Sequence, residues 1–180
     1  MPASPVIRRF ATGDASAVRD LFIRVNRDLA PEALVDAFAA YVERSLREEI
    51  DRIEDYYAAH DGAFFVAEVD GKILGMFGLE SAGADAMEPR RMYVRPDARG
   101  DGRGGRRLAA AEAETLKAGR RRLVLSTSEV QPAALALYRS SGFLEVGVER
   151  AAVASNKALG GDLRRHHFEK QLAANRPGRP

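Results

Sequence analysis

The sequence predicts a mixed α/β fold (α+β), and three observations support this class. Two strand-like segments, 63–69 and 72–79, flank Asp70-Gly71, a dipeptide typical of a two-residue hairpin turn. A strand, a glycine-rich loop and a helix-like segment follow over about 87–118. A second strand–helix pair then continues to residue 140. A hairpin combined with such a strand–helix series is typical of a mixed sheet with flanking helices.

The first third of the chain indicates one short strand and two helices. Residues 6–10 form the strand-like segment, and Asp14 is a suitable N-cap for a helix with apolar residues from 18 to 25. A second helix is predicted to start at Pro31, because apolar residues recur at helical spacing from 34 to 53. Neither helix contains a diagnostic motif.

Strands and helices alternate in the rest of the chain. Gly75 and Gly78 weaken the second hairpin strand unless another group approaches its backbone closely. Gly119 suits the C-terminal cap of a helix, and Pro132 suits the first turn of another. The elements predicted after the hairpin are a strand at 87–95, a loop–helix unit at 99–118, a strand at 123–127, a helix at 132–140, a strand from 143 to 146, an irregular segment at 150–162 and a strand at 163–171.

The glycine-rich loop at 99–105 is the most informative stretch of the sequence. Glycines lack a Cβ atom, so backbone N–H groups can close on phosphate oxygens. The N-terminus of the following helix adds a partial positive charge and unpaired donors. Full charges can come from Arg99, Arg103 and Arg106. The loop therefore predicts a ligand that contains phosphate groups.

Other phosphate-binding loops fit this stretch less well. A P-loop needs Gly-Lys-Ser/Thr, and that tripeptide does not occur here. Gly100, Gly102 and Gly105 formally meet the dinucleotide spacing, but that fingerprint normally lies in the first strand–helix–strand unit. A glycine turn without a ligand is the other alternative, since Gly-Asp-Gly also forms ordinary turns.

Composition limits the class of protein. The 180 residues suit one domain, which we place at 1–172, with a polar tail at 173–180 that we expect to be disordered. The absence of cysteine excludes disulfides, thiolate metal sites and a cysteine nucleophile, and it fits a cytoplasmic location. There is no long apolar run and no signal-peptide pattern, so we expect no membrane partner. A net charge of +2, with its basic residues in separate short clusters, argues against a nucleic-acid partner.

Two motifs together resemble the GNAT acyltransferase superfamily. Residues 92–104 resemble its acyl-CoA pyrophosphate motif, in which Arg or Gln is followed by two residues, Gly, one residue and Gly or Ala. Residues 133–143 resemble the later family helix that ends in Tyr, three residues and Gly-Phe. Segment 126–140 is similar to the N-acetyltransferase-8-like branch, although many GNAT proteins have Asn where Gln131 stands. That branch includes membrane-bound members acting on cysteine conjugates, and we transfer neither property.

The resemblance implies a mostly antiparallel central sheet that is splayed at the acyl-CoA site by a β-bulge. It implies acetyl-CoA as the acyl donor, no metal, and an amine acceptor that is a small molecule or a peptide. A homodimer is expected only by analogy of fold. The implied cofactor-binding residues are Met92, Tyr93, Val94, Arg99, Gly100, Asp101, Gly102, Arg103, Gly104, Gly105, Gln131 and Ala134.

The implied catalytic residues are Tyr138 and Glu88. A phenol at Tyr138 would protonate the thiolate that forms as the acetyl group leaves, although a packed helix tyrosine is the alternative. Glu88 is the first candidate for the general base, because related sequences have an acid at this position on the central strand. Pro89 departs from the family pattern there and removes a strand donor. Glu80 is a weaker candidate.

Three functional hypotheses follow. The leading one is a GNAT N-acetyltransferase that transfers acetyl directly to an amine, since an acyl-cysteine intermediate needs a cysteine. The second is a non-catalytic acyl-CoA-binding or sensor protein on the same fold, which the altered segment around Glu88 leaves open. The third is a basic nucleic-acid-binding module. The three histidines, His60, His166 and His167, form no persuasive metal site, since adjacent strand residues point to opposite faces.

Overall fold

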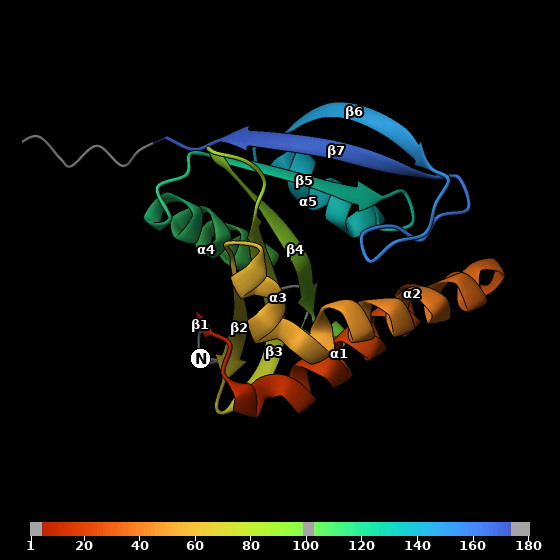
Figure 1. The fold of residues 1–180 in the computed structure, drawn as a ribbon, viewed down its shortest axis with the longest axis horizontal. Helices are drawn as coiled ribbons and strands as arrows, with labels where there is room; N and C mark the ends of the chain where they lie inside the picture. Colours follow the sequence, from red (N-terminus) through yellow and green to blue (C-terminus); the bar gives the residue numbers. More distant parts are fainter. Residues whose placement is uncertain (1–4, 99–102, 174–180) are drawn as a thin grey trace, which may run out of the picture.

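The computed structural model describes residues 5–98 and 103–173, which form one seven-stranded sheet flanked by helices (Figure 1). The strand order is β1-β2-β3-β4-β5-β7-β6, and every neighbouring pair is antiparallel except β4 and β5. The predicted mixed α/β class, with a mostly antiparallel sheet, is therefore confirmed. Among the described helices, none is long and apolar enough to cross a membrane.

The elements follow the predicted order. In chain order they are β1 (Val6–Arg9), α1 (Ala15–Leu29), α2 (Val35–Glu48), α3 (Ile53–Ala59), β2 (Ala63–Val69), β3 (Lys72–Ser81), β4 (Ala86–Val94), α4 (Arg103–Lys117), β5 (Arg122–Ser128), α5 (Pro132–Ser140), β6 (Leu144–Ala151) and β7 (Leu163–Gln171), with short 3-10 turns at Thr12–Asp14, Glu32–Leu34, Ile50–Arg52 and Pro96–Ala98.

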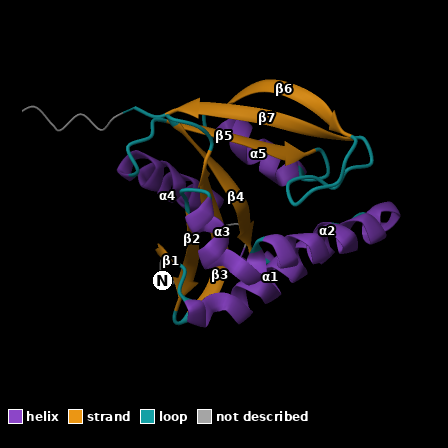
Figure 2. Ribbon diagram, viewed as in Figure 1, coloured by secondary structure: helices purple, strands orange, loops and turns teal. Residues whose placement is uncertain are grey.

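Two apolar cores lie on opposite faces of the sheet. Helices α1, α2 and α3 pack on one face, and α4 and α5 pack on the other (Figure 2). Successive residues of β2 alternate between them, since Phe64 and Val66 belong to the first core and Phe65 to the second. The sheet is therefore the middle of three layers.

Strands β4 and β5 separate soon after they begin. They pair only at Ala86–Arg122 and Met87–Leu123, and in Figure 1 they then diverge. The ladder between β3 and β4 shifts register between Met76 and Gly78. Arg91 is the extra residue on β4, and its φ of 52° marks a bulge. The predicted bulge and V-shaped gap are therefore present, whereas Pro89 itself pairs regularly with Leu79.

The second predicted helix is interrupted. We expected one helix from Pro31 through residue 53, but α2 ends at Glu48 and α3 begins at Ile53. Glu49 has φ −139° and ψ −61°, outside the helical region, and its side chain is completely buried. The break turns the Glu49 carboxylate toward two arginines on β4, and this ion pairing is not visible in the apolar periodicity.

Asp14 precedes α1 as expected but does not cap it through its side chain. Its carboxylate instead accepts hydrogen bonds from Arg8, at 2.7 and 2.9 Å, and from the backbone N–H of Ala11 at 2.8 Å. The guanidinium of Arg8 engages both carboxylate oxygens of Asp14 in charge-assisted hydrogen bonds, which orient the carboxylate toward β1. This link joins β1 to the start of α1.

The close approach predicted for the hairpin glycines is present. A Cβ atom on Gly78 would lie 2.0 Å from the hydroxyl oxygen of Tyr57, and one on Gly75 would lie 3.1 Å from the carbonyl oxygen of Tyr93. The turn residues Asp70 and Gly71 have φ of 49° and 73°, as a type I′ hairpin requires. The sequence at 99–102, with much of the predicted phosphate loop, and the tail from 174 onward lie outside the described residues.

Candidate active site

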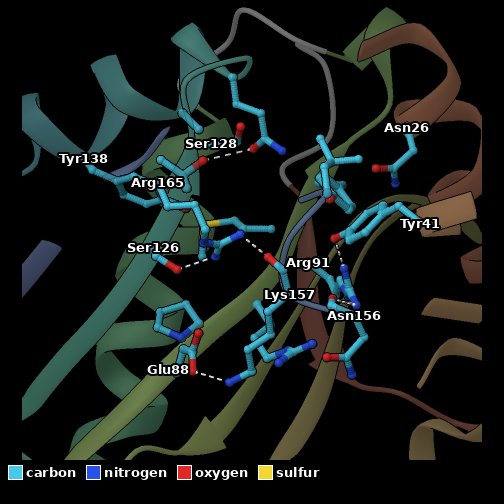
Figure 3. A pocket seen from close by; sticks show the side chains of 18 of the residues that line it. Asn26, Tyr41, Glu88, Arg91, Ser126, Ser128, Tyr138, Asn156, Lys157 and Arg165 are labelled. Carbon is cyan, nitrogen blue, oxygen red and sulfur yellow. Dashed lines mark hydrogen bonds and ion pairs between the residues drawn. The ribbon is translucent and has the colours of Figure 1, made fainter. Parts of the chain in front are cut away.

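A pocket opens where β4 and β5 separate (Figure 3). Its walls come from six elements and one loop, which explains why no single sequence segment reveals it. The lining residues are Asn26 from α1, Phe38 and Tyr41 from α2, Glu88 to Tyr93 from β4, Ser126 to Ser128 from β5, Gln131, Ala134 and Tyr138 at α5, Asn156, Lys157 and Leu159 from the loop before β7, and Arg165 from β7.

Tyr138 lies in this pocket, as the motif predicts. Its side chain is 7% exposed and its ring contacts Phe143 and Phe168, with centroids 5.5 and 5.8 Å away. Burial raises the pKa of Tyr138 to about 12, while the nearby charge of Arg107 acts in the opposite direction. Its hydroxyl makes no hydrogen bond to another described residue. The phenol is therefore protonated at neutral pH and able to donate.

Glu88 lines the same pocket from β4, so the two residues predicted to be catalytic share one cavity. Its carboxylate forms a 2.7 Å ion pair with the Lys157 ammonium (Figure 3). The side chain of Glu88 is 19% exposed. Despite Pro89, the strand keeps Glu88 in register opposite Glu80.

Glu80, the weaker candidate for the base, is not among the pocket-lining residues. Three donors hold its carboxylate: Arg90 at 3.3 Å, Tyr56 at 2.9 Å and Lys157 at 2.5 Å. Burial opposes ionisation of Glu80, but the arginine and lysine outweigh burial and lower its pKa. A carboxylate with this many donors is a poor proton acceptor, so the geometry favours Glu88 over Glu80.

A buried ion network behind the pocket was not predicted from the sequence. Glu49 is 0% exposed, and it accepts from Arg90 at 2.6 Å, from Arg91 at 2.7 Å and from the Tyr57 hydroxyl at 2.7 Å. Burial works against the Glu49 carboxylate, yet the two arginines hold its pKa below its ordinary value. Strict alternation would send Arg90 and Arg91 to opposite faces, but the bulge at Arg91 turns both toward Glu49.

The remaining described cofactor candidates are distributed along the gap. Met92 packs its side chain toward α4 and α5, whereas the ring of Tyr93 packs against Phe22 at 6.0 Å. The side chains of this pair therefore face away from each other, and the strand backbone is left at the gap. Gln131 lies just before α5, and its side-chain oxygen accepts from Thr127 at 3.1 Å.

Comparison with known proteins decides the family. The Acetyltransferase (GNAT) domain model matches residues 60–145. The IAA acetyltransferase of Azospirillum brasilense is 35% identical over 118 residues, which cover 57% of this chain and 76% of that protein. This chain belongs to the GNAT acetyltransferase family. The N-acetylaspartate synthetase of Xenopus tropicalis is also 35% identical, over 114 residues, but the match covers 60% of this chain and only 41% of that protein.

The fold of this GNAT protein is shared with solved structures. A Salmonella typhimurium protein described as an acetyltransferase, solved with its cofactor acetyl-CoA, has a TM-score of 0.70 at 18% identity. The superposition covers 98% of this chain and 99% of that one. Family membership makes the chain an acetyltransferase and removes the dinucleotide interpretation of its glycine loop. The match to the Xenopus relative gives only loose support to the likeness to the N-acetyltransferase-8-like branch.

The GNAT motif places its glycine loop directly before α4. Arg99, Gly100, Asp101 and Gly102 lie outside the described residues, and Arg103 and Gly104 open the helix, as expected for a phosphate-binding N-terminus. At Gly105, a Cβ atom would meet nothing within 4 Å.

Arg107, one turn into α4, was not singled out in the sequence. It is 5% exposed, its Nε atom has no hydrogen-bond partner, and burial lowers its pKa to about 10. Its positive charge and the Tyr138 phenol act on each other across the core. In the sequence, the cluster of arginines at 103, 106 and 107 indicates a phosphate site. Only the packing in the structure shows that Arg107 is buried.

Proposed function

We propose that this GNAT protein transfers an acetyl group from acetyl-CoA to a primary amine by direct attack. The observation that carries the proposal is the shared pocket of Tyr138 and Glu88 at the mouth of the β4–β5 gap. A protonated phenol and a carboxyl group that line one cavity suit a reaction that needs an acid and a base. The name of the Xenopus relative, an N-acetylaspartate synthetase, supports an amine as the acceptor.

The donor would lie along the gap. Beyond Met87, β4 has no partner strand on its β5 side, so backbone groups of Met92 and Val94 are available to the pantetheine amides. The pyrophosphate would meet the N-terminus of α4 and its glycine loop. Gln131 and Ala134 line the pocket near Tyr138, where the thioester would end. The Salmonella protein of the same fold was solved with acetyl-CoA, which supports acetyl-CoA as the donor.

The reaction balances with the groups present. The neutral amine attacks the thioester carbonyl carbon, so a C–N bond forms and the C–S bond breaks. The amine loses a proton to Glu88, directly or through water, and the departing thiolate takes a proton from Tyr138. A thiol ordinarily has a pKa of about 8.5, below that of Tyr138, so full proton transfer needs stabilisation of the phenolate. The positive charge of Arg107 acts in that direction.

Replacement of Tyr138 by Phe tests the general acid. The variant keeps the ring packing but removes the proton, so we expect kcat to fall about 100-fold or more, the usual size of such an effect. Binding of acetyl-CoA, measured by isothermal titration, should remain within about two-fold. Transfer to a panel of amines is followed by CoA release. A normal rate in Tyr138→Phe would make Tyr138 a packing residue, and binding without transfer to any amine in the unaltered protein would favour a sensor.

Replacement of Glu88 by Gln tests the base. An amide cannot accept the amine proton, so we expect kcat/KM to fall about 100-fold at pH 7 and to recover as rising pH supplies neutral amine. The measurement is the pH–rate profile. Glu145→Gln on the exposed strand β6 is the matched control and should keep the original profile. An unaltered profile in Glu88→Gln would assign deprotonation to another group or to bulk water.

We also place this activity in the cytoplasm, in keeping with a chain that has no cysteine. A homodimer stays an expectation from fold analogy.

A further inference from the structure

Four cationic side chains line the pocket, and three of them are neutralised. Arg90 and Arg91 each lie within 2.7 Å of a Glu49 carboxylate oxygen. Lys157 lies 2.5 Å from Glu80 and 2.7 Å from Glu88. Among the residues that the structure describes, Arg165 is the pocket cation that has no ion pair with a carboxylate.

Arg165 reaches the pocket from β7 (Figure 3). Its guanidinium donates to the Ser126 hydroxyl and to the backbone carbonyl of Lys157, and both acceptors are neutral. These two bonds hold the planar group in one orientation without supplying a counter-charge. Burial lowers the pKa of Arg165 from its ordinary value, but a guanidinium remains charged at neutral pH.

Two carboxylates attract Arg165 from nearby elements, Glu88 on β4 and Glu149 on β6, and neither forms an ion pair with it among the described residues. Glu88 is bound to Lys157, and Glu149 is largely exposed and does not line the pocket. The pocket network as a whole therefore contains four cations (Arg90, Arg91, Lys157 and Arg165) and three carboxylates (Glu49, Glu80 and Glu88). One positive charge is left without a partner, in a half-buried position where an unpaired charge is costly.

We propose that Arg165 binds a carboxylate of the acceptor, so that the acceptor is an amino acid or a similar amine bearing one carboxylate. The inference rests on the proposed N-acetyltransferase function and names its substrate class. A guanidinium fork matches a carboxylate in a bidentate arrangement. One unit of negative charge balances the pocket, whereas a phosphate monoester would bring nearly two at pH 7.

The position of Arg165 also fits the chemistry. Tyr138 marks the thioester end of the gap, and Glu88 lies on β4 across from β7. A carboxylate held at Arg165 would leave the neighbouring amine between these two residues. The phosphates of the donor would lie at the N-terminus of α4, so they do not supply the missing charge here.

The test compares each of the twenty common L-amino acids with its primary carboxamide as acceptor, by CoA release. We expect at least one amino acid to exceed its amide by ten-fold or more in kcat/KM. The amide amine is less basic and more of it is neutral at pH 7.5, so intrinsic reactivity opposes this preference. In Arg165→Gln the ratio of kcat/KM for the amino acid to kcat/KM for its amide should fall to about one, chiefly because the KM of the amino acid rises. Arg165→Lys, which keeps the charge but loses the fork, should retain part of the preference.

Arg164 supplies the matched control. It is the exposed neighbour on β7, within 3.7 Å of Glu129, and it does not line the pocket. Arg164→Gln should keep the full preference for the acid over the amide.

Arg165→Gln removes a charge that has no counter-ion, so the melting temperature of this variant should not fall. If it does fall, the comparison is made with Arg165→Lys instead. Equal use of acids and amides by the unaltered protein, or an unaltered preference in both Arg165 variants, would overturn the subsite but leave amine acetylation standing. Transfer to other amines but to neither series would overturn the subsite alone, whereas transfer to no amine in the wider panel would reject the proposed function, and with it this inference.

Discussion

At the scale of single residues, one carboxylate organises the wall of the active site. Glu49 binds two adjacent arginines and a tyrosine hydroxyl, all in the interior. An ion pair of this kind adds little net stability compared with apolar packing, but removing one partner leaves charges buried and unpaired. Glu49 is the acceptor that Arg90 and Arg91 share, in addition to Glu80 for Arg90 and the Asn156 carbonyl for Arg91. The residue therefore positions the strand that carries Glu88 and the backbone at the cofactor gap.

Replacement of Glu49 by Gln should destabilise the protein strongly. The amide keeps the shape but leaves the buried Arg91 without a counter-charge and Arg90 with Glu80 alone, and we expect a loss of about 3–5 kcal/mol of unfolding free energy. Urea unfolding followed by circular dichroism measures it. Glu48→Gln is the matched control, because Glu48 is exposed and 3.7 Å from Arg47, so its loss should be about 0.5 kcal/mol or less. Similar losses in the two variants would refute the organising role of Glu49.

At the scale of elements, local sequence patterns predicted most of the helices and strands but not the break between α2 and α3. The Asp70-Gly71 turn, the start of α5 at Pro132 and the strands around them depend on near neighbours, and they occur as expected. The break between α2 and α3 depends on an ion pair between Glu49 and residues 41 and 42 positions later in the chain. Sequence periodicity carries no information about such a partner.

The candidate site shows the same difference between residues in local motifs and residues brought together from distant parts of the chain. Tyr138 and Glu88 belong to motifs with fixed spacing, so they could be named from the sequence and are now found in one pocket. Lys157 and Arg165 reach that pocket from a loop and a strand near the C-terminus, where no motif marks them. The extra residue in β4 reverses the facing of Arg91, and only the register of the sheet reveals this reversal. Arg165, which we propose to bind the acceptor, is thus a residue that sequence analysis misses.

At the scale of the whole molecule, the two halves of the sheet share little backbone pairing. Strands β4 and β5 join through two residue pairs, and the gap beyond them is where we propose that the cofactor lies. Side chains compensate for the missing ladder on the acceptor side. Lys157, in the loop before β7, binds Glu80 on β3 and Glu88 on β4, while the carbonyl of Asn156 accepts from Arg91. The ion network therefore spans the opening at which the reaction is proposed to occur.

This arrangement predicts acid-sensitive stability. The pKa values of Asp14, Glu49 and Glu80 are all lowered in the folded protein, from ordinary values of 3.8 for Asp and 4.5 for Glu. A carboxyl group with a depressed folded pKa stabilises the fold fully above its unfolded pKa and loses that contribution as the pH falls toward the folded value. We therefore expect the free energy of unfolding to be nearly constant from pH 6 to 8 and to decline below about pH 4.5.

Urea unfolding at a series of pH values measures this decline, and salt separates its sources. Exposed pairs are screened by 0.5 M NaCl, whereas buried pairs are screened much less, so the decline should persist at high salt. It should be shallower in Glu49→Gln, which has lost one titrating group, and unaltered in Glu48→Gln. A curve that is flat down to pH 3 would mean that folding does not lower the pKa values of these carboxyl groups. A decline that salt abolishes would assign the effect to exposed pairs and not to the buried network.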